Sequence, residues 1–415
     1  MTFQNITISG WRQFESINVD LHPRLTTITG ANGAGKSTIL RVLAQHFGFQ
    51  NIMLATPAAT KSGVFQYFAG VFRRKSQDLP HVPQPLGSIS YSDGRTAKLM
   101  VPNAGGVQYN INVEGMSRVD GLFIPSHRPT SVYQQVANIP TNAITAEQAY
   151  QAYNQEVSNR FNNSHSQYSP TYRIKEAIIS MATFGPGNLH VRPNRELERT
   201  FNEFVEVLRK VFPDTIGFKG LEVRIPDVVI STDTGDFVID AASGGLMALV
   251  DLAWQIFLYS RGRNDFVAII DEPENHLHPS MQRSLMGSLV AAFPQVQFVV
   301  ATHSPFVVSS VKDSYVYVLR YDEELDVYRD AGRARVVSQR LDTVNKAGTA
   351  SDILKTVLGV SVTLPIWAEN ELDAISGETP VILDNAGIRN LRHRLEGAGL
   401  GEFYPEALAR IAQRQ

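Results

Sequence analysis

The sequence predicts an α/β fold with a parallel core sheet, an antiparallel β-subdomain beside it and an inserted helical lobe. Three observations predict this class. A glycine-rich segment, residues 30–38, lies between an apolar strand pattern and an apolar helix pattern. Two more apolar stretches, FVAII at 266–270 and VQFVVA at 296–301, each run into polar residues, as buried parallel strands do. Between these regions the apolar period becomes that of helices.

The composition is typical of a large folded chain of balanced charge. The 415 residues include 38 basic and 40 acidic side chains, so no global field draws the protein to nucleic acid or membranes. The absence of cysteine excludes disulfides and thiolate chemistry and suits a reducing compartment. The first residues, MTFQNITISGW, lack a signal-peptide pattern. No apolar run reaches the roughly 18 residues that span a bilayer. We therefore expect a soluble, cytoplasmic protein without a membrane partner.

The first third of the chain has the pattern of strands. ITIS, FESINVDL and LTTIT read as strands that lead into the glycine-rich segment. Residues 86–123 hold short β-like runs, LGSISYS, TAKLMV and VQYNINV, with a turn at Asp93–Gly94. These runs predict an antiparallel sheet beside the parallel core. GLFIP, at 121–125, is predicted to be a further core strand.

Helices are predicted from about residue 143. Thr145 and Gln148 form a capping-box pattern ahead of apolar residues on one helix face; these are Tyr150, Tyr153, Val157 and Phe161. The segments TYRIKEAIISMATF and ELERTFNEFVEVLRKVF predict two further helices, the second ending at Pro213. No long heptad repeat follows, which argues against a coiled-coil arm.

Strands resume at LEVRIPDVVIST and FVIDA, and a partly helical region follows residue 345. We therefore divide the chain into four parts. They are an N-terminal lobe (1–140), an inserted helical lobe (141–215), a C-terminal lobe (216–345) and an extension without an assigned role (346–415).

The glycine-rich segment fits G-x-x-x-x-G-K-[ST], with Gly30, Gly35, Lys36 and Ser37 in the fixed places. Glycines allow backbone N–H groups to converge on phosphate oxygens at a helix N-terminus. Lys36 is predicted to reach the β- and γ-phosphates, and the Ser37 hydroxyl to ligate Mg²⁺. The segment predicts binding of a nucleoside triphosphate. The predicted nucleotide contacts here are Gly30, Asn32, Gly33, Ala34, Gly35, Lys36, Ser37 and Thr38.

Two strand ends supply the remaining polar groups. Asp271 and Glu272 follow an apolar strand, which places Asp271 to hold Mg²⁺ and Glu272 to polarise an attacking water. His303, at the end of the next strand, is predicted to contact the γ-phosphate or that water. The alternative for His303 is a polar residue satisfied at a strand end.

The third segment is DAASGGLMALVDLAWQIFLYS. Ser243, Gly244 and Gly245 open a long apolar helix, where a hydroxyl and free N–H groups make an anion site. The glycine-rich segment already provides one phosphate site, so a second anion site suggests contact with a nucleotide bound by another subunit. The alternative is a helix N-cap whose glycines serve close packing.

Together these segments resemble the ABC-type ATPase superfamily, within the P-loop NTPases. In that superfamily a Ser-Gly-Gly signature closes on ATP held by a partner subunit. The loop GANGAGKS, the start ITISGWRQF, and DEPENHLHP followed by ATHSP resemble its RecF/SMC/OLD-like branch. The resemblance covers residues 1 to about 310. It implies an ATPase that converts ATP and water to ADP and phosphate, with Mg²⁺ as cofactor.

By this resemblance Asp271 and Ser37 serve the metal and Glu272 is the catalytic base. His303 is the switch histidine, Lys36 assists catalysis, and Ser243, Gly244 and Gly245 contact ATP in trans. Two features depart from the family. The signature reads ASGGLM, without the usual following polar residue, and no glutamine matches the Q-loop. The segment IPSHRP, with His127 and Arg128, takes about its place, although a surface ion pair is the alternative for Arg128.

Other polar clusters have simpler interpretations. His276 and His278 lie where the family has its D-loop, so we do not expect a metal pair there. Two basic clusters are expected to be solvated faces, and the carboxylates of the C-terminal region show no metal-binding spacing. The clusters are Arg73, Arg74 and Lys75, and Arg389, Arg392 and Arg394; the carboxylates are Glu369, Glu371, Asp373 and Asp384.

The resemblance also suggests a use for the ATPase. ATP is expected to join two protomers, or a larger homo-oligomer, and hydrolysis to release them. Compact members without arms resemble the sensor ATPases of bacterial anti-phage systems (Septu-like, PARIS-like or retron-associated), which act with a separate effector. A RecF-like DNA repair ATPase, with DNA as partner, is the alternative. A transporter ATPase subunit is a third interpretation, disfavoured by the long insertion and the missing Q-loop.

Overall fold

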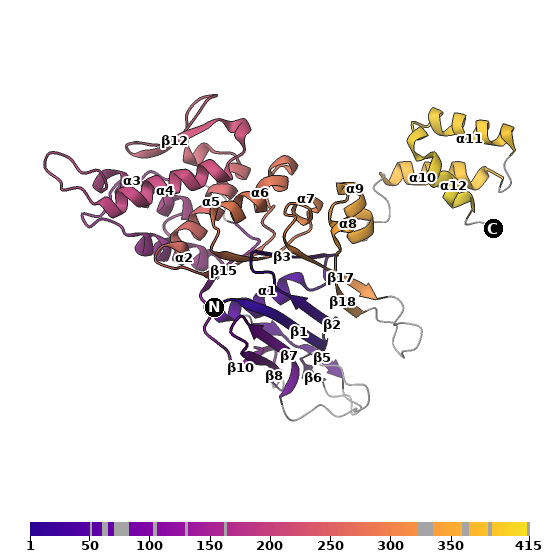
Figure 1. Cartoon of the computed structure of the whole chain (residues 1–415), viewed down its shortest axis with the longest axis horizontal. Helices are drawn as coiled ribbons and strands as arrows, with labels where there is room; N and C mark the ends of the chain where they lie inside the picture. The colour runs from indigo at the N-terminus through magenta and orange to yellow at the C-terminus, as the bar shows by residue number, and fades with distance from the viewer. Residues whose placement is uncertain are drawn as a thin grey trace. The chain divides into compact units, whose positions relative to one another are not determined.

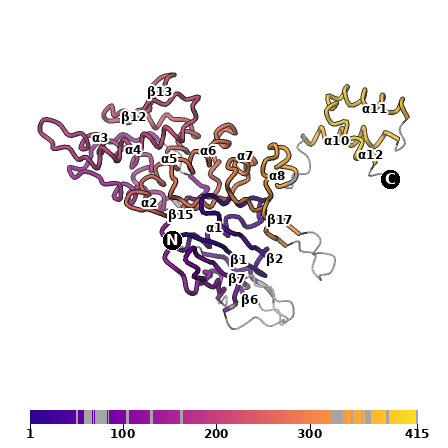
Figure 2. The backbone as a smooth tube through the Cα atoms, viewed as in Figure 1, coloured from indigo at the N-terminus to yellow at the C-terminus, as the bar shows by residue number. Residues whose placement is uncertain are grey.

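The computed structural model describes residues 1–49, 52–59, 65–69, 83–102, 106–128, 132–161, 164–322, 335–358, 365–380 and 384–412. The basic cluster Arg73, Arg74 and Lys75 lies outside these ranges. The chain divides into two compact units, residues 1–353 and 354–415. Figure 1 labels the elements, and Figure 2 traces the same backbone as a tube.

The larger unit is built on one sheet. Its strand order, within the described residues, is β10-β8-β7-β1-β2-β18-β17-β3-β16-β15-β11. The bounds are β1 Phe3–Trp11, β2 Phe14–Asp20, β3 Leu25–Gly30, β7 Gln84–Tyr91, β8 Thr96–Val101, β10 Asn112–Glu114, β11 Gly121–Ile124, β15 Phe266–Asp271, β16 Val296–Ala301, β17 Tyr315–Asp322 and β18 Arg335–Arg340.

The sheet is antiparallel on one side and parallel on the other. The strands from β10 to β2 pair antiparallel, whereas β17, β3, β16, β15 and β11 pair parallel. The two halves are continuous because β18 pairs parallel with β2 and antiparallel with β17. The predicted antiparallel strands are therefore an extension of the core sheet itself. The predicted core strand at 121–125 is its edge strand, β11.

Helices cover the parallel half on both faces, so its central strands β3, β15 and β16 are buried at every position. Phe266, Ala268 and Ile270 of β15 pack into a core with the helices that follow β11. Val267 and Ile269 face the opposite core, which includes α1 (Lys36–Ala44). On the first face lie α2 Ala146–Phe161, α3 Pro170–Phe184, α4 Arg195–Val211, α5 Gly244–Ser260 and α6 Pro279–Ala292 (Figure 1).

The helical lobe follows the sequence prediction closely. Gln148 N–H donates to Thr145 Oγ1 at 3.3 Å, and Thr145 N–H donates to Gln148 Oε1 at 3.0 Å, which is the predicted capping box. Helices α3 and α4 lie side by side (Figures 1 and 2). A small sheet packs beside them, consisting of β12 Phe218–Arg224, β13 Asp227–Thr232 and β14 Phe237–Val238.

The remaining elements of the larger unit are short. Two pairs of strands lie outside the main sheet, β4 Met53–Leu54 with β9 Gln108–Tyr109 and β5 Thr56–Ala59 with β6 Phe65–Phe68. Short helices are α7 Pro305–Val308, α8 Thr343–Lys346 and α9 Ala350–Asp352. A π-helical turn at Ile353–Val357 begins at the last residue of this unit and continues into the next. Single 3-10 turns lie at Gln45–Phe47, Asp214–Ile216 and Ile239–Ala241.

The smaller unit has a core of its own. It contains α10 Ile366–Glu378, α11 Asn385–Gly397, a 3-10 turn at Gly401–Phe403 and α12 Tyr404–Ala412, which pack around Leu372 and Leu395. Three of its carboxylates serve this structure. Asp384 caps α11 by accepting the Gly387 N–H at 2.7 Å, and Glu369 and Asp373 pair with Arg410. No helix in the described ranges has the length and apolarity that a membrane crossing requires.

Candidate active site

The glycine-rich loop joins β3 to α1 and needs its glycines. Gly30, Gly33 and Gly35 have φ of 139°, 79° and 98°, which side chains rarely allow. A Cβ on Gly30 would lie 2.2 Å from the Leu319 carbonyl oxygen of β17, and one on Gly35 would lie 2.4 Å from the Phe14 ring. The loop therefore fits closely between β2, β17 and the start of α1.

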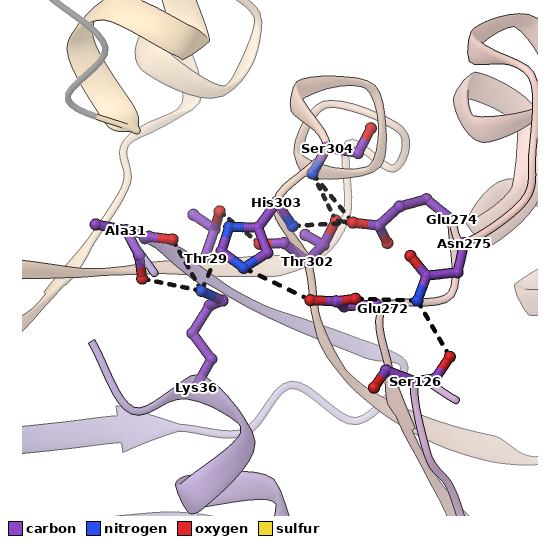
Figure 3. Close-up of polar contacts among 11 residues, drawn as sticks. Thr29, Ala31, Lys36, Ser126, Glu272, Glu274, Asn275, Thr302, His303 and Ser304 are labelled. Atoms are coloured by element: carbon purple, nitrogen blue, oxygen red, sulfur yellow. Dashed lines mark hydrogen bonds and ion pairs between the residues drawn. The ribbon is translucent and has the colours of Figure 1, made fainter. Parts of the chain in front are cut away.

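Lys36 is the first residue of α1 and turns back under the loop. Its Nζ donates to the carbonyl oxygens of Gly30, at 2.9 Å, and Ala31, at 3.1 Å (Figure 3). Burial lowers the pKa of Lys36, while the carboxylates of Glu272 and Asp271 oppose that shift. The ammonium is thus already positioned beside the phosphate loop.

Ser37 and Asp271 come together as predicted for a metal site. The Ser37 hydroxyl hydrogen-bonds the Asp271 carboxylate, and burial raises the pKa of Asp271. Oδ1 of Asp271 is buried and has no hydrogen-bond partner among the described residues. A hydroxyl and a carboxylate oxygen are ligands that Mg²⁺ prefers, with phosphates and water completing its shell. These residues fit the cation, although the described residues contain no group of three acidic or histidine side chains that forms a protein-only metal site.

Glu272 and His303 face each other at the ends of adjacent strands. Glu272 Oε1 lies 3.6 Å from His303 Nε2, and His303 Nδ1 lies 3.5 Å from Lys36 Nζ (Figure 3). An ammonium only donates, so Nδ1 is the unprotonated nitrogen and Nε2–H points to Glu272. Burial and the nearby Lys36 lower the pKa of His303, which keeps the ring neutral at pH 7.

The sequence reasoning missed a second carboxylate, Glu274. Its Oε1 accepts hydrogen bonds from the Thr302 hydroxyl at 2.5 Å, the His303 N–H at 2.9 Å and the Ser304 N–H at 3.2 Å (Figure 3). Burial raises the pKa of Glu274, and its Oε2 has no hydrogen-bond partner in the described chain. Glu274 therefore fixes the turn that carries His303. Glu274 is part of the DEPE pattern, but the pattern alone does not show that its side chain points toward the turn at His303.

Arg128 does not form the surface ion pair considered as its alternative. Its guanidinium donates to three backbone carbonyls, those of Glu272 at 3.1 Å and of Pro273 and Asn275 at 3.3 Å each. Because β11 lies beside β15, the segment after β11 meets the segment after β15. That adjacency was not visible in the sequence.

The signature residues make none of these hydrogen bonds. Ser243 caps α5 by accepting the Leu246 N–H at 3.4 Å, as the N-cap interpretation predicts. A Cβ on Gly245 would lie 3.1 Å from the His276 carbonyl oxygen, so the start of α5 packs tightly on the segment after Glu272. His278 Nδ1 accepts the Ser280 N–H at 3.3 Å and caps α6.

Comparisons with known proteins agree with these motifs. A family model described as "AAA domain, putative AbiEii toxin, Type IV TA system" matches residues 184–309, and a model described as "AAA domain" matches residues 5–49. These segments contain the signature, both strand ends and the phosphate loop.

Three similar proteins illustrate the range of matches. The Septu protein PtuA of Bacillus mycoides (strain KBAB4) is 23% identical over 246 residues, which is 57% of this chain but only 31% of that protein. The Retron Vc95 probable ATPase of Vibrio cholerae is 37% identical over 60 residues, 14% of this chain and 11% of that protein. The SMC head domain of Thermotoga maritima, 14% identical, covers 82% of this chain and 100% of its own with a TM-score of 0.43. The chain thus spans about a third or less of the curated relatives named here.

Proposed function

We propose that this chain, an ABC-type ATPase related to the Septu and retron ATPases, hydrolyses ATP and works as an ATP-gated dimerising switch. The observation that carries the proposal is the convergence of Lys36, Glu272 and His303. They come from the helix after β3 and from the ends of β15 and β16. His303 lies 3.5 Å from Lys36 on one side and 3.6 Å from Glu272 on the other.

In the proposed reaction the loop N–H groups and Lys36 hold the β- and γ-phosphates. Glu272 accepts a proton from the water that attacks the γ-phosphate, because its Oε1 faces the same space as His303. His303, neutral and with Nε2–H toward Glu272, orients that water and the phosphate. Mg²⁺ bound by Ser37 and Asp271 would neutralise charge on the phosphates.

The switch depends on the second anion site. In the proposed closed state the Ser243 hydroxyl and the Gly244 and Gly245 N–H groups contact the γ-phosphate held by another copy of the chain. ATP then binds the closed dimer better than the separate chains, which is the differential affinity that a population shift needs. Hydrolysis removes the shared γ-phosphate and releases the dimer.

We further propose that the switch regulates a separate effector in a bacterial anti-phage defence system. The relationship to Septu PtuA and a retron ATPase supports this use. The test is to purify Glu272→Gln from its native host with Mg²⁺ and ATP and to identify co-purifying proteins. We expect a second protein in fixed ratio that is absent from a Lys36→Ala preparation.

Other outcomes of the same preparation would contradict that role. If no protein co-purifies and DNA stimulates wild-type hydrolysis, with a stimulation that falls steeply as salt rises, the RecF-like alternative replaces it. Co-fractionation with membranes would instead favour the transporter interpretation.

A further inference from the structure

A tight turn carries Glu272 away from the end of β15. The Asn275 N–H donates to the Glu272 carbonyl oxygen at 3.2 Å, which closes the turn. Glu272 has a φ of 49°, a left-handed conformation that non-glycine residues adopt at a cost of about 1–3 kcal/mol. Such a conformation persists only where neighbouring groups hold it.

The neighbouring groups come from the segment after β11. Arg128 binds the carbonyl oxygens of Glu272, Pro273 and Asn275, so every carbonyl it contacts belongs to this turn. These bonds fix the backbone of the turn. They leave the position of the Glu272 side chain unexplained.

The Asn275 side chain holds that carboxylate. Its Nδ2 donates to Glu272 Oε2 at 3.0 Å and to the Ser126 carbonyl oxygen at 3.1 Å (Figure 3). Both neighbours are acceptors, so only the amide nitrogen satisfies them, and both of its hydrogens are used. A flipped amide would place an oxygen against a carboxylate and a carbonyl. The contacts therefore fix the orientation of the amide.

The two carboxylate oxygens of Glu272 therefore have different hydrogen-bonding environments. Oε2 is bound to Asn275, and Oε1 faces His303 Nε2 at 3.6 Å, in a side chain that is 32% exposed. One oxygen is anchored by an amide, and the other faces His303. A base that must meet its water in one place needs this arrangement.

We propose that Asn275 is a positioning residue that holds the Glu272 carboxylate where it activates water, an inference that rests on the proposed ATPase reaction. Asn275→Ala removes both donors. We expect kcat to fall between about tenfold and a hundredfold, because the base is no longer held. KM for ATP should change by no more than about twofold, since Asn275 contacts no predicted phosphate-binding residue among the described contacts.

A double-mutant cycle separates positioning from a general structural role. If Asn275 acts through Glu272, then adding Asn275→Ala to Glu272→Gln lowers single-turnover hydrolysis no further than about twofold. If Asn275→Ala lowers the hydrolysis rate of Glu272→Gln by the same factor as that of the wild type, the proposal is overturned. Gln134→Ala is the matched control, because Gln134 also ties two backbone groups, the Gln167 carbonyl and the Ser169 N–H, far from Glu272 in sequence.

Two further measurements keep the outcomes distinct. The melting temperature and ATP affinity of Asn275→Ala should match those of Gln134→Ala. If both are lower in Asn275→Ala, its lower kcat could reflect misfolding, and the double-mutant cycle in the Glu272→Gln background then decides. Wild-type turnover in Glu272→Gln itself would remove the base assignment and the proposed reaction. A normal kcat in Asn275→Ala alongside a slow Glu272→Gln would remove only the positioning role.

Discussion

The phosphate loop side and the signature side of the molecule are built differently. Around the loop, His303 contacts both Lys36 and Glu272, although His303 and Lys36 are 267 residues apart in the chain. At the signature, Ser243 bonds only its own helix turn among the contacts described here. One side is assembled from distant segments of the chain, and the other is the first turn of one helix, α5, capped by its own serine.

This difference indicates which step of the proposed mechanism requires a second copy of the chain. The groups for binding phosphate and activating water converge within one chain. The signature groups do not join them, so in the proposed mechanism they act on another protomer's ATP. On the assembled side we expect effects that range from loss of ATP binding to a change in pH dependence.

Lys36→Ala is expected to abolish ATP binding and hydrolysis, because the loop loses its only lysine. Titration calorimetry with Mg²⁺ and ATP measures the loss. Lys346→Ala is the matched control: Lys346 is also buried and donates to backbone carbonyls, those of Lys312 and Ser314, but lies outside the site. Equal ATP affinity in Lys36→Ala and wild type would contradict the phosphate assignment.

Glu272→Gln should bind ATP normally and hydrolyse it at least about a hundredfold more slowly, because glutamine cannot take the proton. Phosphate release at saturating ATP gives kcat. A turnover within a few-fold of wild type would show that another group is the base.

Glu274→Ala should lower the free energy of unfolding by about 1–3 kcal/mol or more, because the Thr302 hydroxyl and two N–H groups lose their acceptor. We also expect slower hydrolysis, since His303 sits on that turn. Urea unfolding measures the first effect. Glu274→Gln keeps an acceptor oxygen and should recover most of both; equal losses in the two variants would argue against this role.

The smallest expected effect is on pH dependence. The pKa of His303 lies below its ordinary 6.5, so the ring stays neutral as pH falls from 8 to about 6.5. Below that pH the unfolded chain binds a proton at His303 more readily than the folded chain does. The contribution of His303 to stability is therefore lost as pH drops further. We expect kcat/KM to be flat above pH 6.5. A limb above pH 6.5 that disappears in His303→Gln would contradict the neutral ring.

Much of the fold was predictable because its signals are local. The strands around the phosphate loop and at 266–271 and 296–301, and helices α2 to α4, follow from apolar period, caps and turns. The resemblance to ABC-type ATPases of the Septu and retron kind is confirmed by the comparisons. It rests on motifs whose spacing is fixed by chemistry.

What the sequence did not reveal depends on contacts between distant segments. That β18 would enter the sheet between β2 and β17 is decided by long-range pairing. The same holds for Arg128, for which a surface ion pair was the alternative and which binds carbonyls beyond β15; its place as a Q-loop substitute stays a prediction. Glu274 and Asn275 lie inside a recognised motif, but only the turn at Glu272 directs one to His303 and the other to Glu272.

The most direct test of the central claim is the mass of Glu272→Gln in solution, measured by light scattering with Mg²⁺ and ATP. The account predicts a dimer or a larger assembly with ATP and a smaller species without it. Glu272→Gln combined with Ser243→Arg should still bind ATP but remain the smaller species, because the signature cannot reach a partner's γ-phosphate. An unchanged mass with ATP, or assembly despite Ser243→Arg, would contradict the switch.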